Sequence, residues 1–155
     1  MAVTPYYQPY FIQAALGLKT ANLSTDTMTC GLIATSGLAA RGTSEGYQYV
    51  SQLLANNGSA LTEVTGGGYA RYNLLSVAWT ISGLVVTYTA ANPTWNPATW
   101  TAYYAWIHDE TDSSATDATR PLMCIFDLGG AQTVTGQPFT LAINASGIAT
   151  FTCAA

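Results

Sequence analysis

His108 is the only histidine in the chain, and it stands at the end of a strand-like run. Imidazole is the common general base and metal ligand near neutral pH. A metal site with two histidines, or a relay between paired histidines, cannot be built from one such residue. The adjacent Asp109 points to the opposite face if the strand continues, because side chains alternate along a strand. We therefore expect His108 to be a structural residue at the rim of a sheet.

The carboxylates suggest two other kinds of chemistry. Asp109, Asp112 and Asp117 lie in one acidic loop, whose oxygens suit Ca²⁺ in type. The loop lacks the ligand spacing, central glycine and closing glutamate of an EF-hand, so we expect a solvated turn. Glu63, Asp109 and Asp127 are the candidates for a pair of carboxylates that hydrolyses sugars. Nothing in their surroundings supports that reaction, so we predict no catalytic residue and no enzyme.

Cysteines and glycines offer little more chemistry. The chain has three cysteines, Cys30, Cys124 and Cys153, each in a strand-like run. An odd number without an export signal favours buried free thiols over a disulfide framework. No closely spaced ligand pairs exist for zinc, and we predict no metal and no cofactor. The run from Gly66 to Gly68 lacks the following Lys and helix of a phosphate loop, so it predicts a bulge or a sharp turn.

These residues must be positioned by β-strands, because 63–151 is almost unbroken strand pattern rich in Thr, Val, Tyr and Trp. Run 100–108 has large apolar residues on both faces, so we predict a central, covered strand. Ser82-Gly83 predicts a hairpin turn. Strands are predicted at 28–34, 74–80, 84–90, 100–108, 122–128, 139–144 and 148–153, helices at 11–18 and 49–55, and a loop at 92–97. Many short strands indicate an antiparallel sandwich or barrel, Ig-like or jelly-roll-like.

The 155 residues fit a single domain. Residues 1–22 are predicted to form an extended Pro- and Tyr-rich arm followed by a short helix. Residues 23–155 are predicted to form the β domain. The arm lies either on a neighbouring subunit or on its own domain, and the sequence leaves both arrangements open.

Charge is scarce, at 8% of residues against about 25% in ordinary soluble proteins. The chain has ten Tyr and four Trp, and the centres of protein interfaces are similarly poor in charge and rich in aromatics. A neutral, Thr-rich surface would give the same composition. The few basic residues are scattered, which disfavours nucleic-acid binding. No apolar run approaches the length of a membrane span. The N-terminus lacks the pattern of a signal peptide, so we expect synthesis in a cytoplasm.

A series of short motifs runs along the chain from about residue 23. Among them are Asp26-Thr27, Glu63-Val-Thr-Gly-Gly-Gly-Tyr69, Thr94-Trp95, Asp127-Leu-Gly129 and Gly147-Ile148. In this order the motifs resemble a group of small β-rich structural proteins of tailed bacteriophages, several of them from phages of actinobacteria. Members of that group are described as capsid decoration, minor capsid or minor tail proteins. The resemblance implies a virion protein and gives no catalytic or cofactor residue to transfer.

From these observations we expect a capsid decoration protein on the outside of a phage head, made in the host cytoplasm. Its expected partners are the major capsid protein and its own copies, with a trimer as the expected oligomer. Tyrosine, tryptophan and arginine are enriched at the energetic centres of interfaces. The predicted contact residues are Tyr6, Tyr7, Tyr10, Arg71 and Trp95. A tail or neck protein and a glycan-binding module remain as alternatives.

Overall fold

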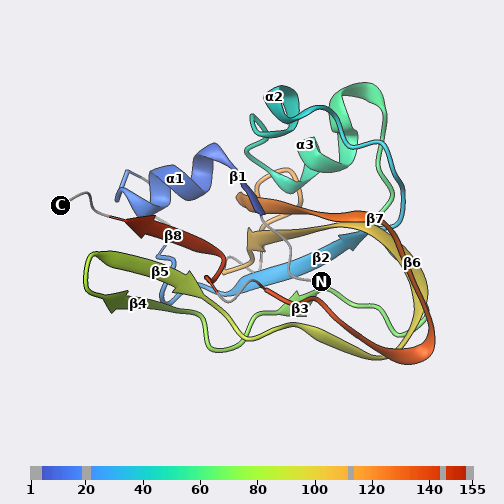
Figure 1. Cartoon of the computed structure of the whole chain (residues 1–155). Coiled ribbons are helices and arrows are strands. Elements are labelled where there is room, and N and C mark those ends of the chain that lie inside the picture. Colours follow the sequence, from blue (N-terminus) through green and yellow to red (C-terminus); the bar gives the residue numbers. More distant parts are fainter. Residues whose placement is uncertain (1–4, 19–21, 112–113, 144–145, 153–155) are drawn as a thin grey trace.

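The computed structural model describes residues 5–18, 22–111, 114–143 and 146–152 (Figure 1). Two open antiparallel sheets form the chain, one in the order β1-β7-β6-β2-β3 and one in the order β4-β5-β8. The strands are β1 (Pro5–Tyr7), β2 (Met28–Ile33), β3 (Tyr72–Asn73), β4 (Ala78–Ser82), β5 (Val85–Thr89), β6 (Thr94–Asp109), β7 (Leu122–Thr140) and β8 (Ala149–Thr152). Of the predicted architectures, the mainly β sandwich is therefore confirmed, and the barrel is wrong because the sheets do not close.

Both faces of the five-stranded sheet are covered (Figure 1). The short helices α2 (Arg41–Ser44) and α3 (Val50–Ala55) pack on one face, around Trp106 and Ile125. The three-stranded sheet and α1 (Pro9–Ala15) pack on the other face. Strand β6 lies at the centre of the larger sheet and has a buried cluster on each side. The prediction of a central, covered strand at 100–108 is therefore confirmed.

Strands β6 and β7 form one long ribbon that bends out of the larger sheet and turns beneath it (Figure 1). The bend coincides with a bulge, since Tyr104 pairs with Asp127 whereas Ala102 already pairs with Gln132. Gly129 and Gly130, at φ 74° and 118°, adopt the left-handed conformations inside the bulge. The predicted loop at 92–97 is wrong from Thr94 onward, because β6 begins there and continues through Pro97. The predicted turn between strands at 122–128 and 139–144 is also wrong, because β7 continues through Gly129, Gly130 and Gly136.

The same bulge changes which face of β6 each side chain occupies. Uniform alternation places Trp100 and Trp106 together. In the structure Trp100 and Ala105 pack in the cluster between the sheets, whereas Trp106 packs under the helices. The register shift between Ala102 and Tyr104 accounts for the difference, because one irregular residue pair exchanges the two faces of a strand.

The segment predicted as an extended arm is part of the fold over its described residues. β1 pairs with β7 at the edge of the larger sheet. Phe11 of α1 is fully buried and packs against Tyr88 of β5, with ring centroids 5.8 Å apart. Of the two arrangements left open, packing on the same domain is the one observed for residues 5–18. The proposed boundary at 22/23 follows residues 19–21, which lie outside the described residues.

Candidate functional site

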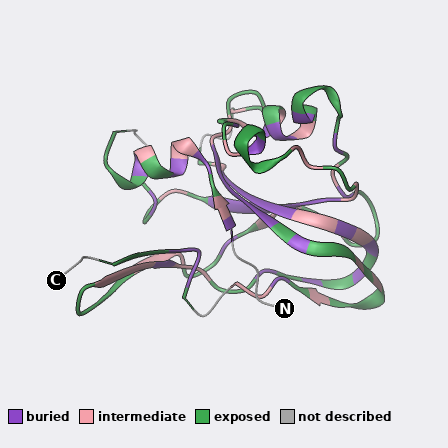
Figure 2. Cartoon of the chain, turned by 45° about the horizontal axis from the view of Figure 1, so that its top comes forward, coloured by how far each residue is buried: buried purple, intermediate pink, exposed green. Residues whose placement is uncertain are grey.

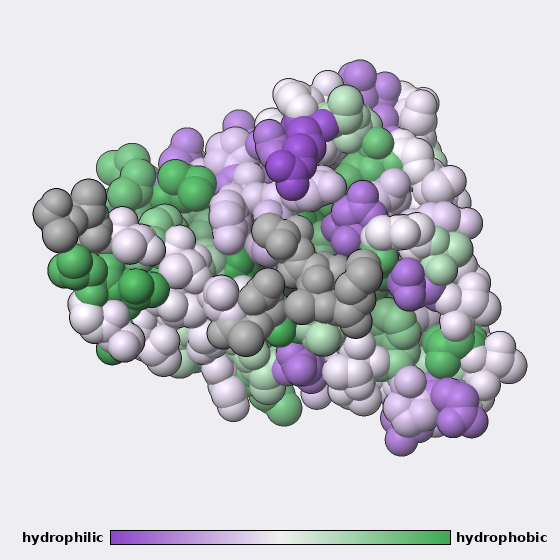
Figure 3. All heavy atoms as spheres, in the orientation of Figure 1, coloured by the Kyte–Doolittle hydropathy of each residue, from purple (hydrophilic) through white to green (hydrophobic). Residues whose placement is uncertain are grey.

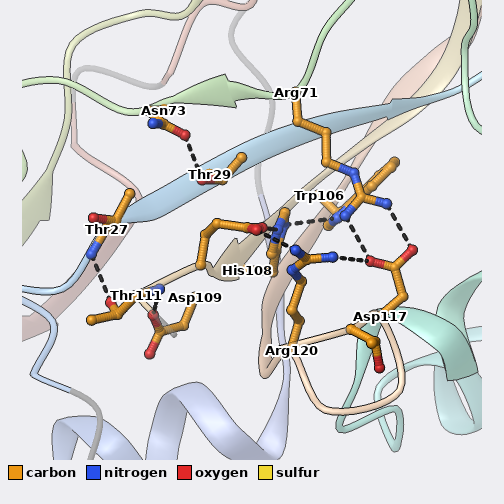
Figure 4. A network of polar contacts seen from close by, with 12 residues as sticks. Thr27, Thr29, Arg71, Asn73, Trp106, His108, Asp109, Thr111, Asp117 and Arg120 are labelled. Atoms are coloured by element: carbon orange, nitrogen blue, oxygen red, sulfur yellow. Dashed lines mark hydrogen bonds and ion pairs between the residues drawn. The ribbon is translucent and has the colours of Figure 1, made fainter. Parts of the chain in front are cut away.

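Charged side chains gather at one place in the described structure, where Arg71 joins two carboxylates. Its guanidinium donates to both oxygens of Glu63 at 2.9 and 2.8 Å and to both oxygens of Asp117 at 2.7 and 2.8 Å. Tyr69 adds a hydroxyl that donates to Glu63 at 2.7 Å. These paired N–H donors match the planar carboxylates, which is the strongest geometry for such a contact. We call this set, together with the four residues described next, the charged network. Figure 4 shows part of it, with Arg71, Trp106, His108, Asp117 and Arg120 labelled.

The other half of the charged network runs through Arg120 to His108. Arg120 donates to Asp117 at 3.0 Å and also to Glu110. Trp106 donates its indole N–H to Nδ1 of His108 at 3.1 Å, and Nε2 of His108 lies 2.6 Å from Glu110. An indole nitrogen can only donate, so Nδ1 must carry no proton and Nε2–H donates to Glu110. His108 is therefore the neutral Nε2–H tautomer.

The local fold explains why these residues meet. Residues 114–121 return from the end of β6 and lie against the start of α3, where the N–H of Ser51 donates to the carbonyl of Asp117 at 2.8 Å. The first N–H groups of a helix have no partner within it. This hydrogen bond therefore gives one N–H at the start of α3 a partner and holds the loop against the helix. Arg71 immediately precedes β3, and its side chain reaches Asp117 in this loop (Figure 4). The charged network therefore ties three distant segments into one face.

The surroundings shift several pKa values. Hydrogen bonds from Arg71, ahead of the opposing effect of burial, lower the pKa of Asp117 to about 2. For Arg71 burial acts to lower the pKa, but the hydrogen bonds that it donates to its two carboxylates prevail and raise the pKa. Burial raises the pKa of Tyr69, and the neighbouring Glu63 adds to the increase. Each of these groups is thus held in the charge state that its partners require.

His108 carries a testable pH dependence. Burial lowers its pKa below 6.5, although Glu110 acts in the opposite direction and Arg71 and Arg120 assist the decrease. As the pH falls through about 6.5 the unfolded chain takes up a proton that the folded chain resists, so stability is lost on acidification until the lower folded pKa is reached. We expect His108→Gln to lose less melting temperature between pH 7.5 and pH 5.5 than the natural protein. An equal loss of melting temperature in the two proteins, measured by circular dichroism, would contradict this expectation.

The chemistry expected from the sequence is only partly found. His108 lies near the end of β6, as predicted, where it pairs with Leu122 at the start of β7. It is fully buried, and its carboxylate partner is Glu110, two residues on. Asp117 is bound by two arginines and is not a free, solvated residue. A sequence signal existed, because Glu110 follows His108 at the strand spacing of two. The strand pattern ends at Asp109, however, and gives no reason to pair Glu110 with His108. Asp112 lies outside the described residues.

The other candidates lie apart. Glu63 binds Arg71, Asp109 accepts from the N–H of Thr111, and Asp127 accepts from the N–H of Gly129. None of these partners is shared, so the three carboxylates are not joined in one polar site within the described residues. Among those residues no group of three or more His, Cys, Asp and Glu side chains is placed to hold a metal ion. Cys30 and Cys124 are buried free thiols, as predicted, and Cys153 lies outside the described residues.

The five predicted contact residues are dispersed. Tyr6 lies beneath the guanidinium of Arg41, 3.9 Å from the ring centroid, and Tyr7 donates to the carbonyl of Ile148 at 2.9 Å. Tyr10 is half-buried against the core. Arg71 belongs to the charged network, and Trp95 is 4% exposed and donates to the carbonyl of Ala70. The roles of these residues in binding a partner stay predictions, and Trp95 has little surface left to offer.

An apolar surface that sequence reasoning missed lies at the opposite end of the molecule. One face of the smaller sheet points into the sandwich. The residues on this face of β4, β5 and β8 are cross-strand partners, namely Trp79, Ile81, Val86, Tyr88 and Phe151. Tyr88 is buried, but Ile81 is 77% exposed and Phe151 is 40% exposed, since the hairpin extends beyond the larger sheet (Figure 2). The apolar end, as we call it, consists of Leu16, Ile81, Leu84, Val86 and Phe151.

The apolar end also has a shallow groove between α1 and the smaller sheet. Ala15, Leu16, Trp79, Val86 and Phe151 line it. Figure 3 shows apolar side chains gathered at the left of the molecule, where α1, β8 and the hairpin of β4 and β5 end. These residues alternate along their strands as core residues do, but no other layer of the described structure covers them. The arrangement can therefore bind an apolar surface.

Charge and apolar surface occupy different parts of the chain. The ranges 72–107 and 128–155 contain no Asp, Glu, Lys or Arg. These ranges include the whole of the three-stranded sheet and the bent half of the ribbon. The charged residues all lie in 19–71 and 108–127. A partner that contacts the apolar end meets no ionised carboxylate or basic group on β4, β5 or β8.

Comparisons with known proteins give no relative for the chain. No family model matches it, and neither the curated proteins nor the solved structures contain a match. In the described parts of the chain no helix has both the length and the apolar character needed to cross a membrane.

Proposed function

We propose that the chain is a non-enzymatic structural protein of a tailed-phage virion, which decorates the outside of the head and stabilises the shell. Its partners are the major capsid protein and its own copies. The observation that supports this best is the uncovered apolar end, which is built on a sheet without charged residues. A surface of this kind costs solubility unless it is covered, and in soluble proteins it marks a contact site.

The mechanism is interfacial. A standard protein contact buries on the order of 1,600 Å² in total. Many such contacts around a shell act together, so that release of one subunit does not open the lattice. The charged network has a structural part in this role, because it holds the loop 114–121 against α3 and the start of β3. The contacts with partners are made at the apolar end.

The measurement that tests this function is the copy number in purified particles of the phage that encodes the chain. Quantitative mass spectrometry against the major shell protein should find a number comparable to that of the shell subunit. A number that is a small fraction of it would assign the chain to the tail or neck instead. Absence from the particles would contradict both virion roles. Deletion of residues 1–10 is a poorer test, because it removes β1 from the sheet as well as three tyrosines.

A further inference from the structure

Strand β4 is an edge strand that lacks the usual protection against pairing. The smaller sheet has the order β4-β5-β8, so the outer edge of β4 pairs with none of the strands that the structure describes. Natural edge strands are normally protected by a charged residue, a proline or a bulge. Ala78–Ser82 contains no charge and no proline, and its pairing with β5 is regular over all five residues. Its backbone is therefore ready to accept another strand.

We propose that β4 pairs antiparallel with β4 of a second copy, so that the two smaller sheets join into one six-stranded sheet. An antiparallel pair of identical strands is related by a two-fold axis, and such a contact closes on itself as a dimer. The inference rests on the proposed function for its purpose, since a subunit that covers a shell needs contacts with its own copies. It makes a dimer, in place of the trimer expected from the sequence, the unit of assembly.

The side chains select a second copy as the occupant and set the register. If Thr80 faces Thr80 of the second copy, Trp79 lies opposite Ile81 of that copy, on the inner face of the joined sheet. Ile81 is 77% exposed in the single chain, and Trp79 is half-buried. Aromatic and β-branched residues form favourable cross-strand pairs, as two threonines do. The exposed Ile81 of each copy is therefore covered by Trp79 of the other copy.

Charge also favours the same partner. The chain has a formal net charge of −4, so two copies repel one another over most approaches. The approach along β4 is an exception, because 72–107 and 128–155 contain no charged side chain. A partner with a basic or acidic patch would find no complementary group on this sheet. A second, equally neutral copy needs none.

Cysteine cross-linking tests the register. Residues that face each other in an antiparallel pair have Cα atoms about 5 Å apart, within reach of a disulfide. Thr80→Cys, made together with Cys153→Ser, should form a disulfide-linked dimer on mild oxidation, while Cys30 and Cys124 are buried and do not compete. Ser82→Cys is the matched control, because its two copies would lie about 14 Å apart along the strands. Equal cross-linking of both variants, or none with Thr80→Cys, would overturn the proposed pairing.

The oligomeric state gives an independent test. We expect the purified natural protein to sediment as a dimer at about 100 μM, a concentration at which modest interfaces are occupied. The variant Ile81→Lys should be monomeric, and its melting temperature should equal that of the natural protein at a concentration low enough to dissociate the dimer. The variant Thr152→Lys, on the outer face of β8, should remain dimeric. A natural protein that stays monomeric would overturn the inference. These measurements use the chain alone, so they can fail while the copy number in particles supports the proposed function, and the reverse also holds.

Discussion

Gly31→Ala is expected to destabilise the protein by about 3 kcal/mol or more, although it adds one methyl group. Gly31 lies in β2, beside the central strand β6 of the larger sheet, and pairs with Trp106 of β6. A Cβ at Gly31 would lie 2.2 Å from Cζ2 of the indole, well inside van der Waals contact. Trp106 is fully buried and holds His108 through its N–H, so it cannot move aside without disturbing the charged network. Thermal or urea unfolding monitored by circular dichroism measures the loss.

Two variants separate this steric cause from a general effect of replacing glycine. Gly42→Ala lies in α2, where an added Cβ meets nothing within 4 Å, and we expect a change below about 1 kcal/mol in the stabilising direction. Trp106→Phe removes the indole ring atoms that the new methyl group meets. The double variant Gly31→Ala with Trp106→Phe should therefore cost less than the sum of the single changes. Strict additivity would show that the contact with Trp106 is not the cause.

Arg71→Met is expected to cost about 2–3 kcal/mol, because it leaves Glu63 and Asp117 partly buried without their shared cation. The side chain of Arg71 is only 20% exposed and makes four hydrogen bonds to these carboxylates. Methionine keeps the length of the side chain, so the loss reports the charge and not a cavity. We expect Arg41→Met to change stability by less than about 1 kcal/mol, since Arg41 is 61% exposed and lies 3.9 Å from Glu45.

A second substitution tests the reason for this loss. Once Arg71 is gone, Glu63 keeps only the hydroxyl of Tyr69 among the side-chain partners described for it. Glu63→Gln removes the charge that then lacks a cation, so Arg71→Met with Glu63→Gln should be more stable than Arg71→Met alone. In the natural background Glu63→Gln should be destabilising. If the double variant is the less stable of the two, the cost does not come from an unpaired carboxylate.

The sequence predicts the β-rich class, the central strand at 100–108 and the short helix before residue 56 because each of these depends on local periodicity. It fails where one irregular pair decides the outcome. The register shift between Ala102 and Tyr104 exchanges the faces of β6, and no sequence pattern at 102–104 indicates it. The sequence also gives no sign that β6 continues through Pro97 and β7 through Gly129, since both residue types normally mark turns.

The charged network illustrates a different limit. Glu63, Arg71 and Asp117 are separated by up to 54 positions in the numbering, and only the fold brings their side chains within hydrogen-bonding distance. In a chain with so few charges, the presence of Arg71 eight residues after Glu63 signals an ion pair at most. The apolar end was missed for the opposite reason, because its residues alternate like an ordinary core strand. Periodicity shows which face a side chain occupies, and not where the opposing layer stops.

The segregation of charge divides the molecule into two parts with different sensitivity to the medium. Ionic strength and moderate acid act through carboxylates, bases and histidine, and all of these lie in 19–71 and 108–127. A contact made through the three-stranded sheet contains no group that responds to either, and salts that strengthen apolar burial would tighten it. A change of salt concentration or a mildly acidic environment would therefore act on the stability of the charged network, and a contact made through the neutral sheet would not be weakened.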